Sequence, residues 1–150
     1  MSDPRIAAVA SMLTEVPTGY YAVRGDELEP LRFVRITLPR TGRWVGYRKI
    51  ATQHGDEYLA AAVQRPNGTL VPIRSEIVDL LILIIADPEE AALAYALEIG
   101  ACCRCSKTLT DERSRWYGIG PECEKINPRI IARVDEIKDG SYEYHNSGVI

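Results

Sequence analysis

The 150-residue chain has no cysteine outside one short segment, residues 102–123, which holds all four. It also lacks a long apolar run, since its longest aliphatic stretch, residues 80–86, is far shorter than the roughly 20 residues that a membrane helix needs. Residues 1–4 do not show the basic and then apolar pattern of a signal peptide. We therefore expect a cytoplasmic protein without a membrane span. In that reducing compartment, clustered cysteines are metal ligands more often than disulfides.

Patterns of catalytic residues are scarce as well. The two histidines, His54 and His145, lie far from the cysteines in sequence, and neither belongs to an H-x-E or H-E-x-x-H pattern. Gly118-x-Gly120 lacks the preceding strand and the third glycine of a dinucleotide-binding fingerprint. These observations predict a protein that is not an enzyme. A metalloenzyme that uses an incompletely ligated zinc is the alternative.

The cysteine pattern itself predicts a zinc site. Cys102 and Cys105 have the C-x-x-C spacing with which a tight turn directs two thiolates at one ion. Pro121 suits the first position of a helix that would carry Cys123 in its opening turn. Zinc is the expected cofactor because it favours thiolates and tetrahedral coordination. Four buried or free cysteines are the alternative interpretation.

The fourth ligand is open at this stage. A treble-clef site, in which a knuckle is followed by a hairpin and a helix, would take a second ligand near position 126, where this chain has Ile126. Cys103, His145, Asp111 and a water molecule are the candidates. We include Cys103 in the predicted ligand set, with Cys102, Cys105 and Cys123.

The cysteine segment resembles a known but uncharacterised domain. Its sequence is Cys102-x-x-Cys105-Ser106-Lys107-x-Leu109-Thr110-Asp111-x-x-Ser114-x-x-x-Gly118-Ile119-Gly120-Pro121-x-Cys123. It is similar to the motif C-x-x-C-G-R-x-L-T-D-x-x-S-x-x-x-G-I-G-P-x-C of a domain that recurs in proteins of actinobacteria and their phages. The resemblance implies metal binding through Cys102, Cys105 and Cys123, in a setting of phage accessory or nucleic-acid proteins. Ser106, where that motif has glycine, and the additional thiol of Cys103 are the departures.

The residues before the cysteines predict an α+β fold with an antiparallel, β-rich N-terminal part. Runs rich in β-forming residues alternate with turn signals such as Pro66-Asn67-Gly68. The predicted strands cover residues 20–24, 31–38, 43–52, 57–64 and 69–73. Whether this meander closes into a small barrel is not legible from the sequence.

Helices are predicted on both sides of this meander. Residues 3–15, 75–85, 88–99 and 128–140 have helical periodicity or capping signals, and residues 141–150 read as a mobile tail. This gives a domain over residues 1–99, a treble-clef-like zinc module over 100–140 and the tail. The helix from Glu76 to Ile85 is apolar almost all round, which predicts a central position in the core or a homodimer interface.

The net charge of −3 is the sum of segments with opposite charge. Residues 20–74 contain nine basic and five acidic residues, whereas residues 75–99 contain six acidic and no basic ones. On the predicted strands, cations that could bind phosphates alternate with rings on which bases could stack. Phe33 can share a strand face with Arg35, as can Trp44 with Arg48, although aromatic residues on strands are more often core. The candidate nucleic-acid-binding residues are Arg32, Arg35, Arg43, Trp44, Arg48 and Lys49.

A second candidate patch lies in the zinc module. It consists of Arg104, Lys107, Arg113, Arg115 and Trp116. Together these features favour a zinc-binding accessory protein, phage-encoded, with DNA or RNA as its partner. The alternative is a protein-interaction module, for example a phage factor that binds a host protein through the apolar helix or the zinc module.

Overall fold

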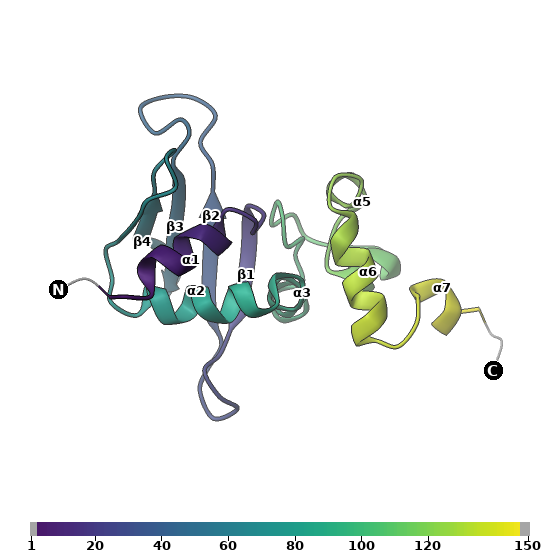
Figure 1. The fold of residues 1–150 in the computed structure, drawn as a ribbon. Coiled ribbons are helices and arrows are strands. Elements are labelled where there is room, and N and C mark those ends of the chain that lie inside the picture. Colours follow the sequence, from purple (N-terminus) through teal and green to yellow (C-terminus); the bar gives the residue numbers. More distant parts are fainter. Residues whose placement is uncertain (1–2, 148–150) are drawn as a thin grey trace.

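The computed structural model describes residues 3–147 and confirms the predicted α+β class (Figure 1). Five antiparallel strands form one sheet in the order in which they occur in the chain. They are β1 (Gly19–Val23), β2 (Arg32–Thr37), β3 (Arg48–His54), β4 (Glu57–Gln64) and β5 (Leu70–Pro72). No pairing joins β1 to β5. The sheet is therefore an open meander and not a barrel.

Two helices cover one face of this sheet. Helix α1 (Ile6–Leu13) and helix α2 (Ile77–Ala86) lie side by side against it (Figure 1). Side chains alternate between the two faces along each strand. On the helix-covered face Tyr21 pairs with Val34 and Ile36 pairs with Ile50, and all four side chains are buried. Residues between them in sequence point to the opposite face.

Most of the apolar circumference of α2 is covered within the single chain. Ile77, Leu81 and Ile84 are fully buried, and α1, β1 and the following helix supply the cover. Ile82 remains 36% exposed. Of the two positions predicted for this helix, the structure therefore shows the one in the core. The homodimer stays a prediction, which light scattering can test.

The remaining helices form the C-terminal half of the molecule. Helix α3 (Pro88–Ile99) packs along β1, and α4 (Glu112–Tyr117), α5 (Pro121–Glu124), α6 (Pro128–Ile137) and α7 (Tyr142–His145) follow it (Figure 1). The bidentate ion pair of Arg133 with Asp87 fastens α6 to the start of α3. Among the described residues, no helix combines the length and the hydrophobicity that a membrane crossing requires.

Two sequence predictions about these elements were wrong. The predicted strand 43–52 begins only at Arg48, because Gly42 and Gly46 adopt left-handed φ angles of 86° and the chain turns between them. The predicted mobile tail contains helix α7, whose cap is Ser141, with its hydroxyl accepting a hydrogen bond from the Tyr144 amide. Residues 148–150 of that tail lie outside the described residues.

Candidate metal centre

Three of the four cysteines converge on one point. The Sγ atoms of Cys102, Cys105 and Cys123 all lie within 4.8 Å of one another. Cys102 is buried, Cys123 is partly buried and Cys105 is exposed, so the cluster reaches from the core to the surface. Zinc bound to thiolates at about 2.3 Å in a tetrahedron would hold its sulfurs about 3.8 Å apart, which small side-chain movements would achieve here.

Backbone hydrogen bonds shape the turn that carries Cys102 and Cys105. The Cys102 amide donates to the Lys107 carbonyl at 2.8 Å, and the Ser106 amide donates back to the Cys102 carbonyl at 2.8 Å. Ser106 has a left-handed φ of 63°, a conformation that glycine adopts more easily. This is the position at which the resembled motif has glycine. Here the Ser106 hydroxyl is hydrogen-bonded to the Tyr95 hydroxyl at 2.8 Å, which fixes the turn against α3.

Amide groups surround the sulfur of Cys102. The backbone N–H groups of Arg104 and Gly120 both donate to it at 3.4 Å. Burial acts to raise the pKa of the Cys102 thiol, but the hydrogen bonds from these two amides and from the amide and thiol of Cys105 outweigh it, and the pKa is lowered. Burial, together with the neighbouring Cys102, raises the pKa of the Cys123 thiol to about 12. The pocket therefore favours a thiolate at Cys102, and a cation would be needed for all three sulfurs to be thiolates together.

Cys103 lies outside the group of three sulfurs. It is fully buried in the core, and burial raises the pKa of its thiol to about 12. Its backbone is held from both sides, because its amide donates to the Gly118 carbonyl at 3.0 Å and its carbonyl accepts from the Tyr20 amide at 2.7 Å. Cys103 thus joins the cysteine segment to strand β1.

The other fourth-ligand candidates have different contacts. The Asp111 carboxylate caps α4 by accepting a hydrogen bond from the Ser114 amide at 3.0 Å. The His145 ring lies 5.1 Å from the Trp116 ring, and its Nε2 is 3.0 Å from the Lys138 carbonyl oxygen. In the described part of the chain, neither belongs to the metal-ligating group.

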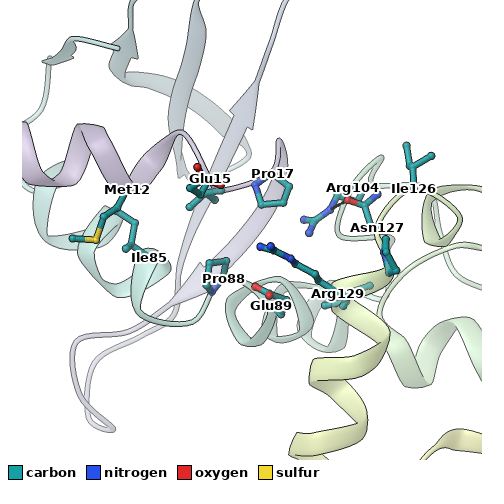
Figure 2. Close-up of a pocket in the computed structure, with 13 residues that line it drawn as sticks. Met12, Glu15, Pro17, Ile85, Pro88, Glu89, Arg104, Ile126, Asn127 and Arg129 are labelled. Atoms are coloured by element: carbon teal, nitrogen blue, oxygen red, sulfur yellow. Dashed lines mark hydrogen bonds between the residues drawn. The ribbon is translucent and has the colours of Figure 1, made fainter.

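A cleft of about 570 Å³ lies between Arg104 and residues 126–130 on one side and the ends of α1 and α2 with the start of α3 on the other (Figure 2). Arg104 and Arg129 reach into it from one side, whereas Met12 and Ile85 line the other (Figure 2). Arg104 also holds the two sides together, since its guanidinium donates to Asn127 at 3.1 Å and to the Tyr21 hydroxyl at 3.4 Å.

The six residues predicted to bind nucleic acid do not form one surface. Arg32 is paired with Glu76 at 3.5 Å, and the Arg35 guanidinium lies 4.7 Å from the centre of the Tyr58 ring on the other face of the sheet. Arg48 points to the helix-covered face and donates to the carbonyl oxygens of Leu13 and Val16.

The other three candidates do meet. Arg43 and Lys49 place their charged groups 5.4 and 5.2 Å from the centre of the Trp44 ring, on which Tyr47 packs edge-on. All three side chains are exposed, those of Arg43 and Trp44 on the loop between β2 and β3 and that of Lys49 near the start of β3. This cluster is the part of the predicted interface that the structure brings together.

Most side chains of the second candidate patch make contacts with residues 109–145. Arg113 pairs with Glu124 and with Glu143, and Arg115 donates to the carbonyls of residues 109 and 110. Trp116 packs against Tyr142 and His145. Lys107 is exposed. These contacts give Arg113, Arg115 and Trp116 a structural role.

Sequence reasoning missed the parts of the site that act through the backbone. The amides of Arg104 and Gly120 contact the Cys102 sulfur, yet backbone groups leave no side-chain pattern to read. Helix α4 was also missed, although Asp111 followed by Ser114 provides a usable capping signal.

The comparison with protein families agrees with an uncharacterised domain at this position. Residues 92–127 match a family of unknown function, DUF6011. The matched segment runs from within α3 through α5 and contains all three clustered cysteines. No curated protein and no solved structure matches the chain.

Proposed function

We propose that this protein binds zinc through Cys102, Cys105 and Cys123 and that the metal has a structural role. The observation that carries the proposal is the convergence of the three sulfurs within 4.8 Å. A thiolate donor set suits zinc, because zinc accepts sulfur ligands readily and has no redox chemistry of its own. Bound there, zinc would link the knuckle at residues 102–105 to helix α5.

A water molecule is our proposal for the fourth ligand. Cys103 has its backbone fixed from both sides and its side chain in the core, so it would have to leave the core to reach the metal. Asp111 and His145 would each have to give up a hydrogen bond.

We propose a non-enzymatic role for the zinc. An imidazole or carboxylate base beside a metal-bound water is the usual feature of a hydrolytic zinc site. Among the described residues, the metal-ligating group contains cysteines only. His54, the second histidine, lies on β3 with its Nε2 2.7 Å from the Thr52 hydroxyl.

Metal analysis of the purified protein tests the zinc proposal. Wild type is expected to contain about one zinc per chain, and Cys102→Ser, Cys105→Ser and Cys123→Ser each to lose most of it. Cys103→Ala is the matched control, since it removes a thiol from the same segment and should retain zinc. Wild-type protein that is metal-free after purification without chelators, and that takes up no added zinc, would refute the proposal.

The wider role that we propose is that of an accessory protein that binds nucleic acid. Its support is the exposed cluster of Arg43, Trp44 and Lys49, which combines cations with an aromatic ring. Titration with DNA and RNA oligonucleotides at low and high salt tests it. Binding should weaken steeply with salt, because phosphate contacts release counterions.

A protein-interaction module is the second candidate, and the cleft of Figure 2 favours it. Met12 and Ile126 line this cleft and are 51% and 80% exposed, so a partner protein could bury both apolar side chains by binding there. Purification from the native cell distinguishes the two roles. A co-purifying protein that Ile126→Asp releases and Trp44→Ala does not would favour the interaction module.

A further inference from the structure

Charge is segregated between the two ends of the sheet. The β2–β3 loop and the β4–β5 turn lie at the same end, since the strands alternate in direction (Figure 1). This end, defined by residues 38–49 and 65–69 and here called the cationic tip, contains five basic residues and no acidic one. The opposite end has the acidic residues. They are Asp26, Glu27, Glu29, Asp56 and Glu57.

Four of the basic residues at the cationic tip are exposed. They are Arg40, Arg43, Lys49 and Arg65. In the described part of the chain, none of the four forms an ion pair. The fifth, Arg48, is partly buried and bound to carbonyl oxygens. The tip is therefore complementary to an anion with several charges.

An aromatic ring stands among these charges. Trp44 is 38% exposed, although an indole ring gains from burial, and two cations lie within 5.4 Å of its centre. Val45, next to it in sequence, and Leu38 on the same loop are about half exposed. The loop thus offers a ring for stacking and separate cations for phosphates.

We propose that the cationic tip binds single-stranded nucleic acid, with an unpaired base stacked on Trp44 and the phosphates on Arg40, Arg43, Lys49 and Arg65. This rests on the nucleic-acid role proposed above and names its surface and its ligand. A single strand fits better than a duplex, because a ring on a loop can stack only on a base that is not already paired and stacked. Arg43 and Lys49 flank the ring, and Arg40 and Arg65 add cations on the same loop and on the neighbouring turn, where successive phosphates of a single strand could reach them.

Fluorescence anisotropy with the full-length, zinc-loaded protein tests this surface. The probes are a labelled oligothymidylate of about 12 nucleotides, within the usual range of single-strand sites, and a labelled hairpin duplex. Trp44→Ala should weaken oligothymidylate binding between about fivefold and 150-fold, the range for the loss of one stacked base, and Trp44→Phe should restore part of it. With four phosphate contacts, the slope of log K against log salt should be about −2.8.

Charge variants give an independent measurement. Arg43→Ser with Lys49→Ser should reduce the salt slope by about half, because two of the four contacts are lost. Lys125→Ser with Arg129→Ser is the matched control, since it removes two exposed cations from the zinc module (residues 100–140) and should leave binding unchanged. Circular dichroism confirms that each variant is folded.

Each other outcome overturns a defined part of the reasoning. Oligothymidylate binding that survives the tip variants but is lost in the module variants refutes the tip and leaves the nucleic-acid role standing. Equal binding of the duplex refutes the preference for a single strand. Binding of the tip to vesicles of anionic lipid in place of either oligonucleotide means that the surface contacts membranes. Lack of binding to any nucleic acid at low salt refutes the role and the surface together.

Discussion

Gly118→Ala should destabilise the contact between the cysteine segment and helix α3. Gly118 ends α4 with a left-handed φ of 71°, and its carbonyl accepts the hydrogen bond from the Cys103 amide. A Cβ atom at this position would lie 2.7 Å from the Cβ of Ala96 and 3.3 Å from the Cδ1 of Leu93. The change therefore adds backbone strain and steric overlap at once.

The expected cost follows from these two effects. A left-handed conformation costs a non-glycine residue about 1–2 kcal/mol. Overpacking in a close-packed core typically costs about 1–3 kcal/mol more. Gly118→Ala should thus lower the free energy of unfolding by about 2–5 kcal/mol, a large fraction of the roughly 5–15 kcal/mol of a natural domain.

Gly100→Ala is the matched control. Gly100 ends helix α3 with a similar φ of 77°, but an added Cβ would have no neighbour within 4 Å. This variant should lose only the roughly 1–2 kcal/mol of the backbone strain. Urea unfolding of both zinc-loaded variants, followed by circular dichroism, measures the difference. Equal stability of the two would show that Gly118 does not pack against α3 as described.

Two further predictions concern arginines that the fold uses. Arg48→Met should lower the free energy of unfolding by about 3–6 kcal/mol, because it removes two hydrogen bonds from a charged group that are worth about 1.5–3 kcal/mol each, and it should leave oligonucleotide binding unchanged. Weaker binding by a folded Arg48→Met would contradict that internal role. The hydrogen bond from Arg133 holds the pKa of Asp87 below its usual value, so the pair stabilises the fold above about pH 4 and that stabilisation is lost as pH falls further. Asp87→Asn keeps the helix cap and should reduce the fall in melting temperature below about pH 4, measured in thermal melts over a pH series. The same pH dependence in wild type and variant would show that the ion pair does not contribute to stability.

Local signals in the sequence were sufficient for most of the fold. Turn residues such as Pro66-Asn67-Gly68 separate the strands, and Asp87 with Pro88 marks the start of α3 where the structure has it. The strand prediction failed at residues 43–47, where Trp44 and Tyr47 favour strands but the glycines on either side of Trp44 turn the chain.

Only the part of the metal site that depends on the sequence spacing of the cysteines could be predicted. The spacing of Cys102 and Cys105 identified a pair that the structure brings together with Cys123. The spacing does not show whether Cys102 or Cys103 joins the three-sulfur cluster. That depends on Gly118 and Tyr20, which bind the Cys103 backbone from distant segments. Arg48 was misplaced for the same reason, since its partners lie at the end of α1.

X-ray absorption at the zinc edge of the wild-type protein tests the central claim most directly, because it counts the sulfur atoms around the metal. We expect three sulfurs at about 2.3 Å and one oxygen at about 2.0–2.2 Å, and the same spectrum from Cys103→Ala. Four sulfurs in the wild type, falling to three in Cys103→Ala, would contradict the placement of Cys103 in the core. Fewer than three sulfurs would contradict the metal centre itself.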